Sequence, residues 1–127
     1  MATRSAPALE HIADLTVTVA APVEAGDVAG LNSRGKRRII PITGGTIRGP
    51  LLNGKILPGG ADFQLIVSAT SSDLDARYII ELSGPDFAGE HIYVRNRALR
   101  RGYAQDIAKL VRNEPVDPSA IYFRGVP

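Results

Sequence analysis

The stretch Gly44-Gly45-Thr46-Ile47-Arg48-Gly49-Pro50-Leu51-Leu52-Asn53-Gly54-Lys55-Ile56-Leu57-Pro58-Gly59-Gly60-Ala61-Asp62-Phe63 decides the fold, because it places six glycines and two prolines between short apolar runs. Glycine reaches positive φ without a steric penalty, and proline cannot donate to a strand ladder. The stretch therefore predicts tight turns that join short strands. It ends on a carboxylate beside an aromatic ring.

The segments on either side of this stretch carry the period-two alternation of strands. Apolar residues alternate with hydroxyls within residues 9–20, and we expect further strands at 38–43, 61–68, 74–82 and 91–96, with a polar loop at 24–36. Tyr103, Ile107, Leu110 and Val111 share the spacing of one helix face, which predicts a single helix over 103–112. Many short strands with one helix favour a sandwich or a barrel, and closure into a barrel removes exposed edges.

The bulk composition describes one ordinary globular domain over residues 1–127, with a net charge of +2. There is no cysteine, which excludes a disulfide scaffold, a thiolate metal site and a cysteine nucleophile. No apolar run approaches the roughly 20 residues that span a bilayer, and no secretory signal is visible at the amino terminus. We therefore expect a cytoplasmic protein with no membrane partner.

Several recognised motifs are excluded by their context. The segment 49–56 begins like a phosphate-binding P-loop, but Ile56 stands where Ser or Thr is needed, and Pro58 prevents the following helix. His11 and His91 lack a partner at ligand spacing, so we expect no metal, and no nucleotide-cofactor motif is present. The basic cluster 33–38 has no interleaved aromatic residue, so we do not expect a nucleic-acid partner.

Polar residues on three predicted strands are the candidates for chemistry. Asp62 and Gln64 share one strand face, Asp75 and Arg77 share a face of a later strand, and Tyr93, Arg95 and Arg97 share a face of another. If these faces line a barrel interior, a carboxylate meets a guanidinium there and can orient a polar ligand or take part in acid–base chemistry. A structural ion pair or an outward-facing rim is the alternative interpretation.

With these residues in view, the chain resembles the family catalogued as domain of unknown function 3237. The resemblance covers nearly the whole chain and rests on residues 37–46, 49–50, 54–63, 74–78, 92–97, 118–119 and 122–124, in which Gly59-Gly60-Ala61-Asp62 is the most specific element. It implies a mainly β, antiparallel, lipocalin-like barrel with one helix. It also implies two further strands beyond Val126-Pro127, and a barrel without them has an open edge that a second copy is a candidate to cover.

The function expected at this point is the binding of a small organic ligand in the barrel. Asp62 and Tyr93 are the candidate catalytic residues, as base or acceptor and as donor. Gln64, Asp75, Arg77 and Arg95 are the candidate ligand-binding residues. Catalysis stays open; a cofactor-independent lyase, isomerase or hydrolase acting on an organic, for example aromatic, acid is the class that fits. A non-catalytic interaction or structural module is the alternative.

Overall fold

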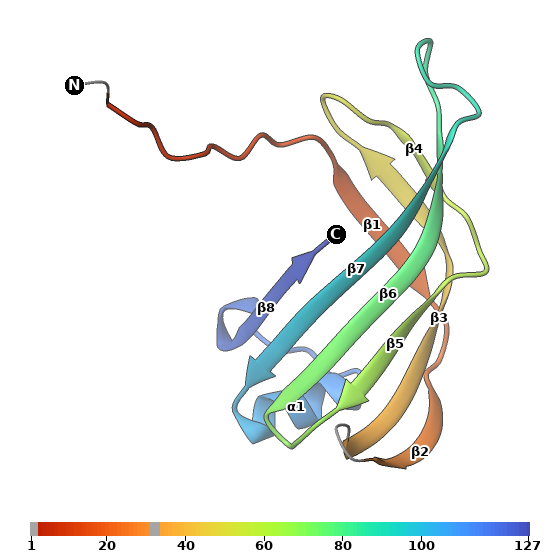
Figure 1. The fold of residues 1–127 in the computed structure, drawn as a ribbon. Helices are drawn as coiled ribbons and strands as arrows, with labels where there is room; N and C mark the ends of the chain where they lie inside the picture. Colours follow the sequence, from red (N-terminus) through yellow and green to blue (C-terminus); the bar gives the residue numbers. More distant parts are fainter. Residues whose placement is uncertain (1–2, 31–33) are drawn as a thin grey trace.

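The protein folds as one curved antiparallel sheet with a single α-helix at one end (Figure 1). The structure is a computed structural model and describes residues 3–30 and 34–127. Its elements are β1 (Asp14–Val19), β2 (Val23–Ala29), β3 (Arg34–Arg48), β4 (Gly54–Ile56), β5 (Ala61–Ile66), β6 (Ser71–Leu82), β7 (His91–Gly102), α1 (Ala104–Val111), a 3₁₀ turn (Pro118–Ala120) and β8 (Ile121–Val126). The expected mainly β, antiparallel architecture with one helix is confirmed.

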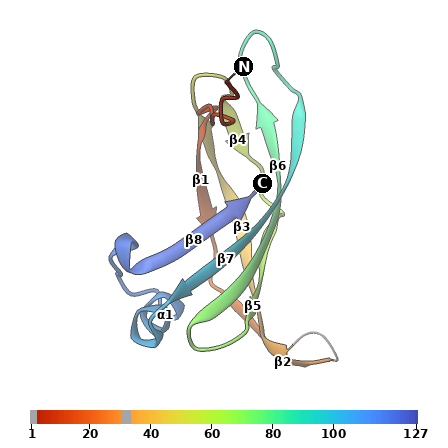
Figure 2. The ribbon, with the colours of Figure 1, turned by 60° about the vertical axis from the view of Figure 1, so that its left-hand side comes forward.

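The long strand β3 organises one side of the sheet. Its first half pairs with β2 and β5, and its second half pairs with β1 and β4. Strand β6 pairs with both β4 and β5, and β7 and β8 follow it. Figure 2 shows how the strands curl around a common interior, with α1 across its lower end. Within the described residues β8 does not pair with β1, so both strands are edges of the sheet.

A bulge in the middle of β3 allows this strand to serve two sets of neighbours. The register with β1 shifts between Thr18 and Val19, and Gly45 is opposite Val17 at φ +145°. A Cβ at Gly45 would lie 2.1 Å from the carbonyl oxygen of Thr16, so a side chain does not fit there. The opening glycine pair of the decisive stretch therefore lies inside the continuous strand β3, beside this bulge, and not in a hairpin turn.

The core lies on the inner face of the sheet, which we define as the face that carries the buried side chains of β6 and contacts α1. The predicted alternation of β6 is confirmed, because Leu74, Tyr78, Ile80 and Leu82 are buried while the residues between them are more exposed. From β3 and β4, Ile42, Ile47 and Ile56 pack in one cluster with Tyr78, Ile80 and Leu82. Burial of these aliphatic side chains is the main stabilising contribution, at about 25 cal/mol per Å² of apolar surface.

Helix α1 closes one end of the interior through a single buried residue. Ile107 is only 2% exposed, and a Cβ placed on Gly102 would lie 3.3 Å from its Cδ1 atom. The helix follows β7 directly and begins at Ala104, one residue after the predicted start. None of the helices formed by residues 3–30 and 34–127 has the length and hydropathy to cross a membrane.

Several expected strand boundaries are wrong. The strand expected over 9–20 is limited to β1 (Asp14–Val19), and the one expected at 38–43 is part of the longer β3. The loop expected at 24–36 is largely strand, because Val23–Ala29 forms β2 and β3 begins at Arg34, while residues 31–33 lie outside the described residues. The polar composition of β2 reflects its position at the edge, where nearly all its side chains are exposed. The strand predicted at 91–96 continues to Gly102, because β7 pairs with β6 over its whole length and then with β8. This extension brings Arg100 into the sheet.

Candidate ligand-binding site

The alternation of the strands divides the six predicted site residues between the two faces of the sheet. Asp62 is directly opposite Ala76, so it lies on the inner face together with Gln64. Asp75 and Arg77 lie on the outer face of β6, and the register places Tyr93 opposite Ile79 and Arg95 opposite Arg77. The structure therefore brings Asp62 together with Gln64 and not with Arg77.

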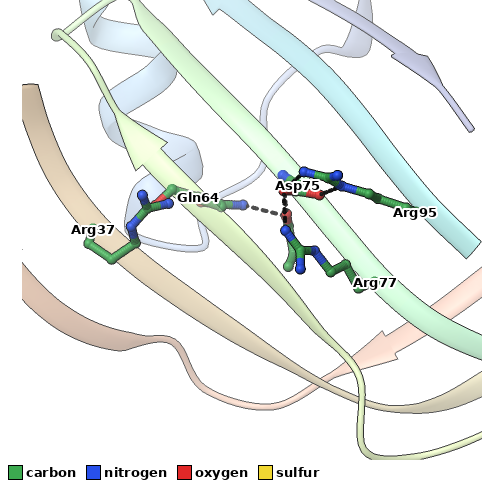
Figure 3. Close-up of polar contacts among 6 residues, drawn as sticks. Arg37, Gln64, Asp75, Arg77 and Arg95 are labelled. Atoms are coloured by element: carbon green, nitrogen blue, oxygen red, sulfur yellow. Dashed lines mark hydrogen bonds and ion pairs between the residues drawn. The ribbon is translucent and has the colours of Figure 1, made fainter. Parts of the chain in front are cut away.

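On the outer face, Asp75 is held by two arginines (Figure 3). Arg95 donates from Nε to Oδ1 at 3.2 Å and from Nη2 to Oδ2 at 3.0 Å, and Arg77 donates from Nη2 to Oδ2 at 3.0 Å. The hydrogen bonds from Arg95, followed by those from Arg77, lower the pKa of Asp75 to about 2. Nearly half of each guanidinium-bearing side chain is exposed, so this cluster is a solvated ion-pair network.

On the inner face, Gln64 and Asp62 form a fixed pair. Gln64 is 3% exposed and donates from Nε2 to Oδ2 of Asp62 at 2.8 Å, while Oδ1 of Asp62 accepts the backbone N–H of Asp75 at 3.2 Å. Because an ionised carboxylate only accepts, this contact sets the orientation of the Gln64 amide. Its oxygen Oε1 is buried without a hydrogen-bond partner among the described residues.

Two inner-face arginines that we did not predict complete this polar layer. Arg38 is 6% exposed; its Nε lies 3.2 Å from Oε1 of Glu24, and its Nη2 donates to the carbonyl oxygen of Val111 at 3.1 Å. Arg38 therefore links β2 and β3 to the carboxyl end of α1, where a positive charge is favoured by the helix dipole. It lies opposite Gln64 in the ladder between β3 and β5.

Arg100 is the second of these arginines, and it is short of partners. Its Nε and Nη2 atoms are buried with no hydrogen-bond partner among the described residues. Burial, and then the positive charge of Arg38, lower the pKa of its guanidinium, while the carboxylate of Asp62 opposes this effect. Ser72, directly opposite Arg100, is fully buried and its hydroxyl also has no partner in the described part of the chain.

The two arginines face a common cavity of about 550 Å³, which we call the inner cavity. It opens between the inner face, the β1–β2 connection and the carboxyl end of α1. Its lining residues are Val19, Ala20, Ala21, Pro22, Arg38, Ile40, Arg100, Leu110, Val111, Arg112 and Asn113. Most of them are aliphatic, so the inner cavity offers an apolar wall with positive charge at one side.

This region holds two positive and two negative side chains, but no carboxylate of the described residues forms an ion pair with Arg100. Arg38 and Arg100 lie on the inner face with Asp62, and Glu24 is 62% exposed in its pair with Arg38. A buried positive group without full compensation is costly unless an anion or hydrogen-bond acceptor reaches it. The described residues contain no group of three or more His, Asp or Glu side chains that could hold a metal ion.

The signal for the missed residues was present in the sequence. In β7 the even-numbered positions Ile92, Val94 and Ala98 are the less exposed ones, and Arg100 continues that series. Arg38 likewise precedes Ile40 and Ile42 at spacings of two. The strand predicted over 91–96 ended too early to include Arg100, and grouping Arg38 with the cluster 33–38 obscured its inward position.

The comparisons with known proteins agree with the resemblance inferred from the motifs. Residues 7–127 match the family model described as Protein of unknown function (DUF3237). A UPF0311 protein of Bradyrhizobium diazoefficiens is 47% identical over 104 residues, which cover 80% of this chain and 65% of that protein. A UPF0311 protein of Rhodopseudomonas palustris is 42% identical over 95% of this chain and 75% of its own length. The chain thus spans only part of the length of these relatives.

Solved structures extend the similarity to the fold. The conserved protein of unknown function RPA1785 from Rhodopseudomonas palustris superposes with a TM-score of 0.78 at 38% identity, covering 95% of this chain and 74% of that chain. A protein from Acinetobacter baumannii, described as beta-barrel like, gives a TM-score of 0.60 at 32% identity, covering 93% of this chain and 78% of its own. The curved sheet described above is therefore a barrel-like fold shared with these proteins.

Proposed function

Because this chain belongs to the family described as Protein of unknown function (DUF3237), we propose its function from its own geometry: it binds a small organic acid in the inner cavity. The observation that carries the proposal is the buried guanidinium of Arg100, whose Nε and Nη2 atoms have no partner among the described residues. Buried donors of this kind cost about 1–3 kcal/mol when they stay unpaired, so an acceptor is expected to reach them.

Arg95, on the same strand, indicates what that acceptor is. It holds the carboxylate of Asp75 through its own Nε and Nη2 atoms, at 3.2 and 3.0 Å. This edge of a guanidinium matches the two oxygens of a carboxylate. In Arg100 the same edge has no hydrogen-bond partner among the described residues, so we propose that the acid group of the ligand takes the position that Asp75 takes at Arg95.

The rest of the inner cavity supports an apolar body for the ligand. Ile40, Leu110 and Val111 line it together with the β1–β2 connection. A volume of about 550 Å³ falls within the range of small-molecule sites. Arg38 is held by Glu24 and by the end of α1, and it adds positive charge beside Arg100 without needing to move. An aromatic or medium-chain aliphatic monocarboxylate satisfies both the charge and the apolar wall.

For Asp62 we propose a role beside this acid. It is half-buried on the inner face, and the negative charge of its carboxylate opposes the lowering of the Arg100 pKa by burial. Asp62 does not line the inner cavity itself, so we propose that it acts on a ligand that extends from the cavity past Arg100, as the general base of a cofactor-independent lyase, isomerase or hydrolase. Tyr93 lies on the outer face and is 61% exposed, so the proposal does not include it in this chemistry.

Ligand-dependent thermal stability tests the binding proposal. Wild type is melted with increasing benzoate, 4-hydroxybenzoate and hexanoate, and with benzamide as the uncharged counterpart of benzoate. We expect at least one of the acids, and not benzamide, to raise the Tm, since a ligand at about 100 times its Kd adds about 2.7 kcal/mol to the free energy of unfolding.

The variant Arg100→Gln is expected to lose that increase, whereas Arg48→Gln, an exposed arginine at the far end of β3, is expected to keep it. Unliganded melting of each variant separates folding from binding. Acids that stabilise Arg100→Gln as much as wild type would count against the proposal. For an acid that binds, proton NMR of the mixture over hours tests conversion, which Asp62→Asn is expected to abolish while binding persists.

A further inference from the structure

The outer face of the sheet carries a second set of functional groups, separate from the inner cavity. Three aromatic side chains are exposed there, Phe63 of β5 at 37%, Tyr93 of β7 at 61% and Tyr122 of β8 at 52%. Arginines of β3, β6, β7 and β8 share this face with them. By strand register these arginines are Arg37, Arg48, Arg77, Arg95, Arg97, Arg101 and Arg124.

Two shallow grooves meet at Phe63. The first has a volume of about 340 Å³ and runs between the turn at 58–61 and the side chains of Arg77 and Tyr93. The second has a volume of about 250 Å³ and is bordered by Arg37, Asp75 and Arg97. Phe63 lines both grooves, so an extended ligand can pass from one to the other along the sheet.

The turn of the family signature shapes the first groove. A Cβ on Gly60 would lie 2.3 Å from the carbonyl oxygen of Arg77, so only glycine lets this turn pack so closely against β6. The guanidinium of Arg77 lies 5.9 Å from the centre of the Phe63 ring, and Tyr93 stands at the other side of the groove. The result is a groove with two aromatic faces and a fixed positive charge.

Part of the positive charge on this face remains uncompensated. Asp75 neutralises Arg77 and Arg95 in a shared network. Arg97 makes no ion pair with any carboxylate of the described residues, although Asp73 borders the same groove. Likewise Arg101 and Arg124 pair with no carboxylate within residues 3–30 and 34–127. This part of the face therefore attracts anions.

We propose that this outer face binds single-stranded nucleic acid. Aromatic faces interleaved with arginines are the features that such surfaces use, the rings stacking on bases and the guanidinium groups contacting phosphates. The sequence argued against a nucleic-acid partner because the basic cluster 33–38 contains no aromatic residue. Folding supplies the aromatic residues from β5 and β7, beside a different set of arginines.

Fluorescence anisotropy with a labelled oligo(dT) of about 12 nucleotides tests the proposal, with salt varied from about 50 to 200 mM. We expect binding that weakens with salt. Tyr93→Ala is expected to weaken binding at least about fivefold through lost stacking. The matched control is Phe87→Ala, which removes a 44% exposed aromatic side chain from the β6–β7 loop and is expected to change nothing.

Arg97→Gln is expected to reduce the slope of log K against log salt by about 0.7, the value for one phosphate of a single strand. Lys109→Gln, on the exposed side of α1 and outside the two grooves, is expected to leave the slope unchanged. Poly-glutamate is added as a competitor, because it carries negative charge like the oligonucleotide but has no bases to stack. The proposal is overturned if no binding occurs at low salt, if poly-glutamate competes as well as unlabelled oligo(dT), or if Tyr93→Ala binds like wild type.

Discussion

Arg95 and Arg100 lie on the same strand and serve opposite faces of the sheet. Arg95 holds the carboxylate of Asp75 outside through Nε and Nη2, at 3.2 and 3.0 Å, whereas the same two atoms of Arg100 are buried inside without a partner among the described residues. The protein itself supplies hydrogen-bond acceptors for Arg95. The corresponding donors of Arg100 have none in the described part of the chain, which is why we place an organic acid in the inner cavity.

The fully buried hydroxyl of Ser72 provides a test of the polar layer in the unliganded protein. Its Oγ atom has no hydrogen-bond partner in the described part of the chain. Replacing such a group removes a desolvation penalty of about 1–3 kcal/mol without breaking a contact. Ser72→Ala is therefore expected to raise the free energy of unfolding by about 1 kcal/mol in urea titrations, while Ser71→Ala, its half-buried neighbour, stays near wild type. A loss of stability in Ser72→Ala would contradict this description.

The bulge of β3 predicts a large penalty at one glycine. In Gly45→Ala the new Cβ clashes with the carbonyl oxygen of Thr16, and the backbone of the alanine is held at φ +145°. The control is Gly26→Ala, where φ is +91° but nothing lies within 4 Å of the new atom. Positive φ alone costs about 1–2 kcal/mol. We therefore expect the free energy of unfolding, measured by urea denaturation, to fall by this amount in Gly26→Ala and by clearly more in Gly45→Ala. Equal losses would show that the close approach of β1 is not required.

The Asp75 network predicts a specific dependence on pH. The pKa of Asp75 falls from 3.8 to about 2 on folding, so its stabilising contribution is complete above about pH 5 and is mostly lost as the pH falls to about 2. Asp75→Asn lacks this titration. The urea midpoint of wild type is therefore expected to fall more steeply than that of Asp75→Asn between about pH 4 and pH 2. Parallel curves for the two proteins would mean that the contacts with Arg95 and Arg77 do not persist in solution.

Much of the fold follows from the pattern of single strands. The alternation of Leu74, Tyr78 and Ile80 predicts which face of β6 is buried, because a strand has only two faces and one of them meets the core. The same rule explains why β2 was missed. An edge strand with both faces near solvent carries no alternation, and only its pairing with β3 identifies it.

The site could be predicted only in part, because each strand was assigned faces without knowing how the strands pair. Asp62 and Arg77 each lie on a consistent face of their own strand, but the register of β5 with β6 sets Asp62 opposite Ala76. A shift of one residue in that register would have exchanged the faces. Relative facing between strands depends on turns and bulges, and a single sequence does not determine these.

The most direct test of the central claim observes the Arg100 side chain itself. A proton–nitrogen correlation spectrum resolves the arginine Nε–H groups, and Arg100→Lys and Arg95→Lys assign the two signals by their loss. On titration with an acid that raises the Tm, the Arg100 Nε–H signal is expected to move downfield and saturate with the same Kd, while the signal of Arg95, already bound to Asp75, stays in place. An Arg100 signal that does not move at saturating acid would contradict the assignment of the inner cavity as the binding site.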